Sequence, residues 1–339
     1  MSTSSATASV SRSETGPARD VHLVADVGGT NARFALTDAA GEPASIEVLK
    51  SAHFPDLQAA LEAYLQHVGN PEVKVAGIAI ATPITGDRVS MTNHDWSFSI
   101  KALKAALRLE RLEVVNDFVA LAWSVPVLEG RWLRQIGPGR AVPDAPRVII
   151  GPGTGLGVGG LVRAPGGEWQ TVASEGGHTS FSPTSEFETR VLQYCWREHS
   201  HVSFERLVSG PGLALLYRAL CHLQGEPALD LEAAAIVAQA QGGTDARCRE
   251  AVQLFCRLLG SFAANVALTY GSTGGVYLSG GVLEHLGSLF DEAGFRAGFE
   301  AKGRFATYLA PIPTSLVTAP YPALLGMAAL LARGSTHQT

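Results

Sequence analysis

Two segments of the chain have the same order of elements, and this repetition constrains the fold more than any other feature. The first is an apolar strand at His22–Val27, a glycine loop, and a second strand at Ala32–Thr37. The second begins at Arg147 and reads VIIGPGTGLGVGGLV, which is again strand, glycine loop and strand. The likeness lies in the order of elements and not in residue identity. Two such hairpins about 125 residues apart predict a duplicated core that binds a ligand between its halves.

The rest of the chain alternates strands and helices in its first half and is mostly helical in its second half, an α/β pattern. Apolar runs at Val73–Ala81, Leu112–Val115 and Val276–Leu278 are typical of buried strands. Helical spacing of apolar residues predicts helices at Asp56–His67, Lys101–Leu109, Phe187–Glu198, Gly212–Leu223, Leu231–Gln241, Ala246–Leu268 and Pro322–Arg333.

The length of 339 residues exceeds what one hydrophobic core usually serves, so we expect two domains. The last apolar helix, Pro322–Arg333, is expected to fold back onto the first domain. The predicted small α/β domain therefore comprises residues 21–127 plus 318–334, and the large α/β domain comprises residues 128–317. Residues 1–20 are small and polar, without the apolar stretch of a secretory signal, and this composition predicts a disordered tail.

Composition argues against several classes of binding partner. The formal net charge of −5 gives no electrostatic reason to bind nucleic acid or an anionic membrane. No apolar run reaches the roughly 20 residues that span a bilayer. The four cysteines form no C-x-x-C pair, as a zinc knuckle or redox site would have: they are Cys195, Cys221, Cys248 and Cys256. A reduced, cytoplasmic protein with a small-molecule partner fits these observations.

The two glycine loops are candidate phosphate sites, because glycine lets backbone N–H groups approach a phosphate without a Cβ in the way. The first loop contains Gly28, Gly29 and Thr30, and the second contains Gly153, Thr154 and Gly155. Asp26, just before the first loop, can hold Mg²⁺, usually through water. Either loop alone can equally be a tight hairpin. Together they predict that one loop from each half of the chain binds the same triphosphate.

Two other nucleotide motifs do not apply. The chain has no G-x-x-x-x-G-K-[ST], which excludes a Walker-type site. A literal G-x-G-x-x-G occurs at Gly155, Gly157 and Gly160, but a dinucleotide fingerprint must open a helix. Here the glycines alternate with apolar residues and run into a Pro-Gly-Gly turn, which is strand behaviour. We interpret the match as accidental.

Three polar groups flank these loops and suit a sugar, since hydroxyls are recognised by fixed carboxylates, amides and imidazoles. Asn116 and Asp117 end a buried strand, Glu175 and His178 lie beside flexible glycines, and Glu205 precedes a Gly-Pro-Gly break. Each group also has an ordinary interpretation. Asp117 can cap the following helix, His178 can be a hydrogen-bonded histidine without a ligand, and Glu205 can occupy the first turn of a short helix.

Six segments, in this order, resemble the bacterial ATP-dependent glucokinases, from about Val21 to Arg333. They are VADVGGTNARFAL, ATPITGDRVSMTNHDWSFS, VVNDF, GPGTGLGVGGL, SEGGHTSFSP and RLVSGPGLALLYRA. The resemblance implies a two-domain, duplicated sugar kinase/actin-like (ribonuclease H-like) fold with an interdomain cleft. It also implies transfer of phosphate from ATP to the 6-hydroxyl of D-glucose with Mg²⁺, in a homodimer.

The resemblance assigns roles to individual residues. Asp117 would be the catalytic base, and glucose would be bound by Asn116, Asp117, Glu175, His178 and Glu205. ATP would be bound by Ala25, Asp26, Val27, Gly28, Gly29, Thr30, Gly153, Thr154 and Gly155, with Gly280 and Gly281 near the adenosine. Ala25 and Ser174 depart from expected glycines, and Asp95 stands where the family often has another residue. A related kinase family has a zinc-binding cysteine cluster, but only Cys195 lies nearby here, so zinc is not expected.

Three rivals remain at this stage. A kinase for another hexose, such as mannose or an N-acetylated sugar, belongs to the same class. A sugar-sensing regulator on the same fold would need a DNA-binding domain, which residues 1–20 are too short and polar to form. A dehydrogenase would rest on the accidental glycine match alone.

Overall fold

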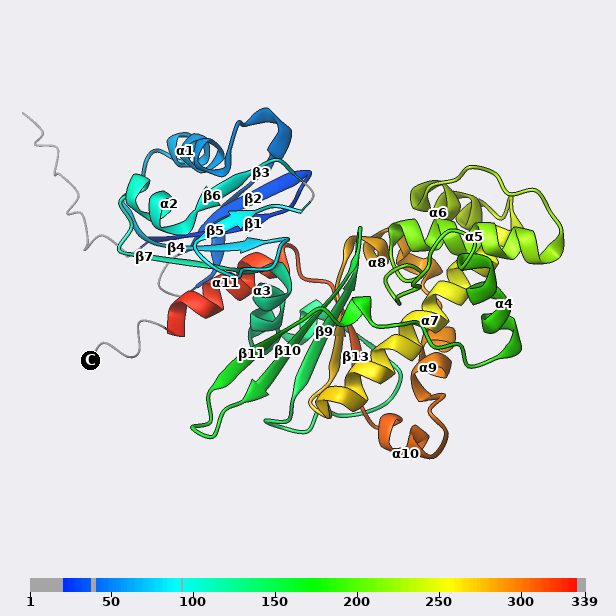
Figure 1. The fold of residues 1–339 in the computed structure, drawn as a ribbon. Helices are drawn as coiled ribbons and strands as arrows, with labels where there is room; N and C mark the ends of the chain where they lie inside the picture. Colours follow the sequence, from blue (N-terminus) through cyan, green and yellow to red (C-terminus); the bar gives the residue numbers. More distant parts are fainter. Residues whose placement is uncertain (1–20, 38–40, 93, 334–339) are drawn as a thin grey trace, which may run out of the picture.

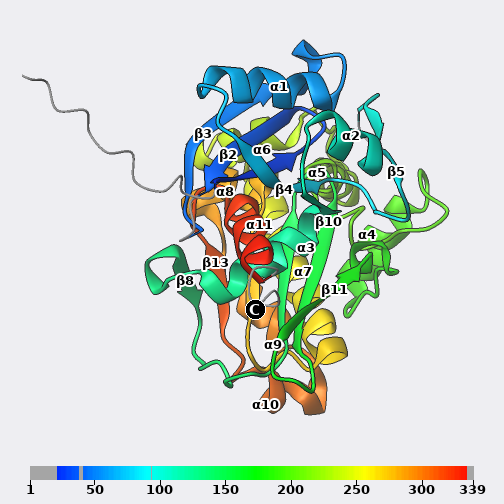
Figure 2. The same cartoon turned by 90° about the vertical axis from the view of Figure 1, so that its left-hand side faces the viewer.

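The computed structural model describes residues 21–37, 41–92 and 94–333, so the expected tail at residues 1–20 lies outside the described residues. Two lobes stand side by side, each built on a mixed β-sheet (Figure 1). The helices α3 and α11 lie between the two sheets (Figure 2).

The small-lobe sheet has the strand order β3-β2-β1-β4-β7. Its first three strands are antiparallel, and β4 and β7 extend the sheet in parallel with β1. Helices α1 and α2 cover one face with an apolar cluster. The elements are β1 (Val21–Val27), β2 (Asn31–Thr37), β3 (Pro43–Lys50), α1 (Leu57–His67), β4 (Val73–Ile80), β5 (Arg88–Ser90), β6 (Ser97–Ser99), α2 (Ile100–Ala106) and β7 (Arg111–Asn116).

The large-lobe sheet has the order β11-β10-β9-β12-β13-β8 and repeats the same plan. Three antiparallel strands are followed by two strands parallel to the first, with β8 added at the edge. The duplicated core expected from the sequence is thereby confirmed. The strands are β8 (Leu133–Ile136), β9 (Arg147–Pro152), β10 (Leu156–Arg163), β11 (Trp169–Ser174), β12 (Val276–Leu278) and β13 (Thr314–Val317).

The large-lobe helices pack together into the largest apolar cluster of the protein. Among the described residues, α7 is the one helix long and apolar enough to cross a membrane, yet 78% of its most apolar stretch is buried in this core. It therefore lies where the central helix of a folded domain lies. The helices are α4 (Glu186–Cys195), α5 (Gly210–Gln224), α6 (Ala233–Gly242), α7 (Ala246–Tyr270), α8 (Gly281–Leu286), α9 (Glu292–Glu300) and α10 (Ala306–Leu309).

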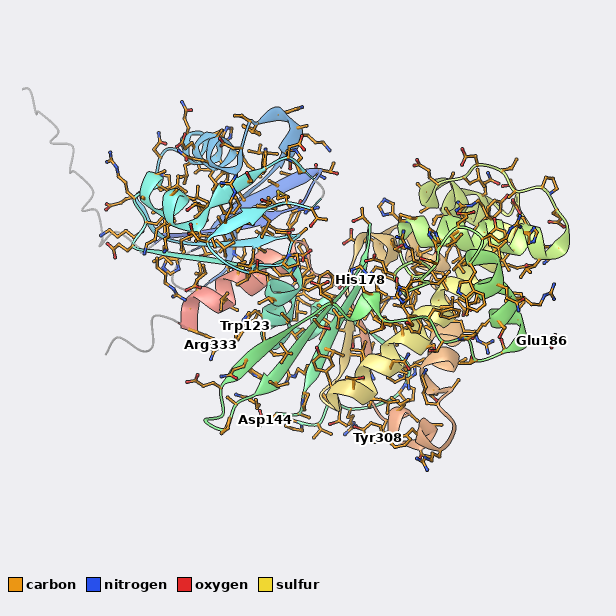
Figure 3. All side chains as sticks on the ribbon, viewed as in Figure 1. Trp123, Asp144, His178, Glu186, Tyr308 and Arg333 are labelled. Carbon is orange, nitrogen blue, oxygen red and sulfur yellow. The ribbon has the colours of Figure 1, made fainter. Side chains whose placement is uncertain are left out.

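Helix α3 (Asp117–Ser124) contacts both sheets, and α11 (Pro322–Arg333) packs on the small-lobe sheet as expected. Ala120 shares a cluster with β1 and β4 residues, while Ala122 packs against Ile149 of β9. At the end of α11 the Arg333 guanidinium lies 4.5 Å from the Trp123 ring centroid (Figure 3). Arg333 also pairs with Glu168 of the β10–β11 hairpin at 2.9 Å, so α11 is tied to both lobes.

Glycines make this close packing possible. A Cβ on Gly157 would lie 1.9 Å from the Phe118 ring, and one on Gly159 would lie 2.4 Å from the Phe118 carbonyl oxygen. On the other side of α3, a Cβ on Gly326 of α11 would lie 1.8 Å from the Ala120 carbonyl oxygen. The G-x-G-x-x-G match therefore runs into strand β10, where its second glycine, Gly157, packs against a helix from the other half of the chain.

Several boundaries differ from expectation. The helix predicted to reach Leu109 ends at Ala106, and the one predicted to reach Glu198 ends at Cys195. The strands β3, β8, β11 and β13 and the helices α8 to α10 were not expected. Six of these seven elements have eight or fewer residues, and most of β3 is exposed, so neither alternation nor helical periodicity marks them clearly.

The close contact between Gly326 and α3 predicts how a substitution there changes thermal stability. Alanine normally stabilises a helix interior by about 1 kcal/mol over glycine. At Gly326 the added methyl must displace the α3 backbone, an overpacking cost of roughly 1–3 kcal/mol. We expect Gly326→Ala to lower Tm by several degrees in a thermal melt. The matched control is Gly242→Ala, since that Cβ would meet only Thr244 Cγ2 at 3.7 Å. If Gly326→Ala melts with or above wild type, the close contact is not a constraint.

Candidate active site

A cavity of about 870 Å³ separates the two lobes. Residues from both sheets and from α3 line it, as expected for an interdomain cleft. The sequence-predicted residues among its lining are Asp26, Gly28, Asn116, Asp117, Gly153, Thr154, Gly155, Glu175, His178, Glu205, Gly280 and Gly281. Four others do not line it. Ala25 and Val27 are buried in the small-lobe core, while Gly29 and Thr30 lie in the first loop outside the cavity wall.

Strand direction explains why residues so distant in sequence meet here. In each lobe, parallel strands end at the same sheet edge, which is where α/β proteins bind ligands. The paired strands β1, β4 and β7 bring Asp26, Thr82 and Asn116 to this edge in the small lobe. The paired strands β9, β12 and β13 do the same in the large lobe.

Asp117 begins α3, and its neighbour Asn116 is the N-cap of that helix. The Phe118 N–H donates to Asn116 Oδ1 at 2.9 Å and to Asp117 Oδ1 at 3.0 Å. The Asn116 amide also donates to the Thr82 carbonyl oxygen at 3.4 Å. Capping therefore falls mainly on Asn116, because the N-cap position is the one that serves the orphan N–H groups. The Asp117 carboxyl group lines the cleft.

Burial raises the pKa of Asp117 to about 7, and the nearby negative charge of Asp26 adds to the increase. The hydrogen bond from the Phe118 N–H opposes the increase without cancelling it. Burial also raises the pKa of Asp26, although Arg33, whose Nη1 lies 3.0 Å from Asp26 Oδ2, opposes this. A carboxyl group with a pKa near 7 can both take and release a proton at neutral pH.

Three more predicted residues meet on the large-lobe wall. His178 Nδ1 lies 3.6 Å from Glu205 Oε1, and His178 Nε2 lies 3.9 Å from Glu175 Oε2. Glu205 is the anchored member, since its Oε2 accepts from the Leu156 N–H at 3.0 Å. It lies in a turn ahead of α5 and not at the start of a helix. His178 lies near the centre of the molecule (Figure 3), and its side chain and that of Glu175 are mostly exposed. The group thus offers several carboxylate and imidazole atoms to one ligand.

Some glycines of the cleft are required by backbone conformation or by the space around them, and others are not. Gly280 has φ +151°, and its Cβ would lie 2.5 Å from the Pro152 carbonyl oxygen, so backbone conformation and space both require it. A Cβ on Gly153 or Gly281 would meet nothing within 4 Å. The Gly153 N–H donates to the Gly155 carbonyl oxygen at 2.8 Å, so this loop is a tight hairpin as well. Open space at Gly153 and Gly281 leaves room for a ligand to approach the backbone.

A divalent cation would find oxygen ligands on the small-lobe side. Asp26 and Asp117 are carboxylates in one cleft, the hard ligands that Mg²⁺ prefers. Across residues 21–37, 41–92 and 94–333 there is no group of three or more His, Cys, Asp or Glu side chains arranged for a metal. Magnesium commonly completes its shell with water and substrate phosphates, so these residues fit it.

Some cleft residues had no predicted role. The hydroxyls of Thr82 and Thr92 lie 3.2 Å apart on the small-lobe wall, and Arg33 fixes Asp26. Glu284 and Tyr321 line the cleft on the large-lobe side and at the crossing to α11. Thr82 and Thr92 lie within one of the six segments that carried the family resemblance, and this was the sequence signal that could have assigned them to the site. Glu284 and Tyr321 had none, because only the tertiary fold brings them to the cleft.

This duplicated core, with carboxylates and glycine loops facing each other across a cleft, defines a two-domain sugar kinase of the actin-like group. A family model described as Glucokinase matches residues 23–334. The glucokinase of Chromobacterium violaceum is 52% identical over 310 residues, covering 91% of this chain and 89% of that protein. The chain belongs to the glucokinase family, whose reaction is the ATP-dependent phosphorylation of glucose.

Two further comparisons agree. The Bifunctional protein glk of Burkholderia thailandensis is 50% identical over 318 residues, and these cover 94% of this chain but only 49% of that protein. The chain thus spans about half the length of this bifunctional relative. The crystal structure of a glucokinase from an Antarctic psychrotroph is 38% identical with a TM-score of 0.85, covering 93% of this chain and 99% of that one.

The raised pKa of Asp117 predicts the pH dependence. A base must be ionised to act, so kcat/KM for glucose is expected to rise with pH through a midpoint near 7 and then level off. Removing the Asp26 charge in Asp26→Asn is expected to move this midpoint to lower pH, even if activity falls. Glu72→Gln, at an exposed site, is the control and leaves the midpoint unchanged. A wild-type midpoint below about 5, close to that of an ordinary carboxyl group, would contradict the assignment.

Proposed function

We propose that this cleft transfers the γ-phosphoryl group of ATP to the 6-hydroxyl of D-glucose and gives glucose 6-phosphate and ADP. Membership of the glucokinase family supports the two substrates. The observation that carries the site assignment is Asp117, a buried carboxyl group with a pKa of about 7 where the two lobes meet.

Asp117 acts as the general base in this proposal. Its ionised carboxylate accepts the proton of the 6-hydroxyl while the sugar oxygen forms a bond to the γ-phosphorus. The bond from the γ-phosphorus to the bridging oxygen breaks, and that oxygen leaves with ADP. The proton on Asp117 then passes to water after the products leave. Phosphoryl transfer of this kind needs mainly positioning and charge neutralisation from the protein.

The remaining polar residues hold the sugar. Asn116 is oriented by its bonds to Phe118 and Thr82, and Glu205 is oriented by the Leu156 N–H. Glu175 and His178 complete the large-lobe side. Because the sugar groups belong to both lobes, a bound sugar would favour closure of the cleft. Closure would exclude the water that otherwise competes for the phosphoryl group.

The nucleotide lies against the glycine loops in this proposal. The backbone around Gly28 and around Gly153 faces the phosphates, and Gly280 and Gly281 border the adenosine. Asp26 would hold Mg²⁺ through water, with Arg33 fixing the orientation of its carboxylate. When bound, the ion supplies charge neutralisation for the phosphates.

Other expectations from the sequence remain proposals. We infer a cytoplasmic location, supported by four cysteines that are all unpaired and buried. We also infer a homodimer, as the family resemblance implies. The domain boundaries at residues 127 and 318 are supported by the position of α3 and α11 between the lobes.

The role of Asp117 is tested by Asp117→Asn. Asparagine has the same size and can hydrogen-bond a hydroxyl, but it cannot accept a proton at neutral pH. General-base catalysis contributes about 10²–10⁴-fold, so kcat is expected to fall at least that far. Glucose binding, measured by calorimetry, is expected to weaken much less, because Asn116, Glu175, His178 and Glu205 remain. Tm is expected to change little, since Asn116 still caps α3.

The same variant separates a base from a structural residue. If Asp117 only supported α3, turnover would survive and Tm would fall. A variant retaining more than about a tenth of wild-type kcat would place the base elsewhere, since general-base loss typically exceeds that.

Sugar selectivity tests the assignment of the large-lobe group and the rival hexoses. We expect Glu175, His178 and Glu205 to crowd the 1- and 2-hydroxyls of glucose. The acetamide of N-acetylglucosamine would clash there and leave polar groups unpaired, which costs on the order of 10⁴-fold in kcat/KM. A coupled assay over glucose, mannose and N-acetylglucosamine measures this. Comparable kcat/KM for glucose and N-acetylglucosamine would refute the assignment.

A further inference from the structure

The connector from β13 to α11 crosses between the lobes, and Tyr321 has its most strained backbone conformation. This residue directly precedes α11 on the small-lobe sheet, in the connector from β13 of the large-lobe sheet. Its φ is +50°, in the left-handed region, which is a genuine outlier for a bulky aromatic residue. Pro322 follows it and further restricts its backbone. Such strain persists only where the surroundings hold it, and it is commonly found at functional sites.

The surroundings that hold Tyr321 can be identified. The Leu324 N–H donates to the Tyr321 carbonyl oxygen at 3.0 Å, so the residue starts α11. That helix is fixed by Leu324 and Met327, which are fully buried against the small-lobe sheet. Pro320 and Pro322 limit the backbone on each side. The position of the Tyr321 ring is therefore set by the fold and not by free rotation of a loop.

Tyr321 lines two separate hollows. One is the interdomain cleft. The other is a cavity of about 400 Å³ behind α11, whose lining includes Ile46, Val127 and Trp132. Pro320 and Tyr321 line both hollows, so together they form the partition between them.

Strand pairing locates this partition at the nucleotide end of the cleft. Strands β12 and β13 run in parallel, with Leu278 opposite Leu316. The segments that follow them therefore leave the same sheet edge side by side. One is Ser279 to Gly281, and the other is the connector that contains Tyr321. The sugar-binding group of Glu175, His178 and Glu205 belongs to different elements of the large lobe.

We propose that Tyr321 packs against the purine base of ATP and forms the end wall of the nucleotide half of the cleft. The inference rests on the proposed function, because it takes Gly280 and Gly281 to border the adenosine. A flat aromatic ring on a rigid connector suits a flat base, since every base presents a π-face for stacking. Without the ring, the cleft would open into the cavity behind α11 and the base would lose its wall.

The test uses Tyr321→Asn, because asparagine tolerates the left-handed backbone conformation and removes the ring. Loss of one base–aromatic contact is expected to raise the Kd of a non-hydrolysable ATP analogue, and the KM for ATP, about tenfold. The KM for glucose is expected to stay at its wild-type value. Tyr321→Phe keeps the ring and is expected to restore analogue binding.

The matched control is Tyr308→Asn on α10. Tyr308 is 38% exposed and Tyr321 is 36% exposed, so both variants remove a similar half-buried ring. Tyr308 lies far from the cleft, at the opposite end of the large lobe (Figure 3), and its loss is expected to leave the analogue Kd unchanged.

Two results would overturn the inference. One is an unchanged analogue Kd in Tyr321→Asn. The other is an equal loss of glucose and analogue binding, which would indicate general distortion of the fold. The analogue Kd is measured without turnover. A wild-type protein that binds the analogue but does not phosphorylate glucose would therefore refute the proposed function and leave the Tyr321 test intact.

Discussion

The close packing of α3 against glycines of strand β10 and helix α11 is the interaction on which the rest of the structure depends. Phe118 lies over Gly157, and the α3 backbone contacts Gly159 on one side and Gly326 on the other. No larger residue fits these three positions without displacing α3. The helix therefore joins the two lobes at the point where its first residue, Asp117, enters the cleft. Interiors are packed densely enough that a shift of one methyl group is felt, so this seating fixes the base relative to both lobes.

The same seating has an electrostatic consequence. Asp117 occupies the first turn of a helix, where the dipole favours a negative charge. Burial and the charge of Asp26 outweigh that preference, because the pKa still rises to about 7. The folded state thus favours protonated Asp117. This contribution to stability is fully present below the unfolded pKa of about 4 and is lost as pH rises through about 7. An active base at neutral pH is therefore obtained at some cost to stability, and packing of α3 offsets that cost.

Sequence reasoning reached the parts of the fold with strong periodicity or clear boundaries. The hairpin β1–β2, the long helix α7 and the last helix α11 were predicted almost as they are, because apolar runs and glycine or proline mark their ends. Short edge elements were not predicted. Strand β13 has four residues, and its identity as a strand depends on pairing with β12 and β8. Glu284 and Tyr321 could not be placed in the cleft for a similar reason, since topology alone brings them there.

Glycine shows most clearly where sequence reasoning ends. Gly157, Gly280 and Gly153 lie in similar glycine-rich segments, yet each is glycine for a different reason. Packing requires glycine at Gly157, packing and backbone conformation both require it at Gly280, and neither requires it at Gly153. A motif search treats the three alike, which is why the accidental dinucleotide match and the phosphate loop overlap in one segment. Only the space around each Cβ separates them. A glycine that is required by neither neighbours nor φ is the kind that ligand approach explains, and Gly153 and Gly281 are both of this kind on the wall of the cleft.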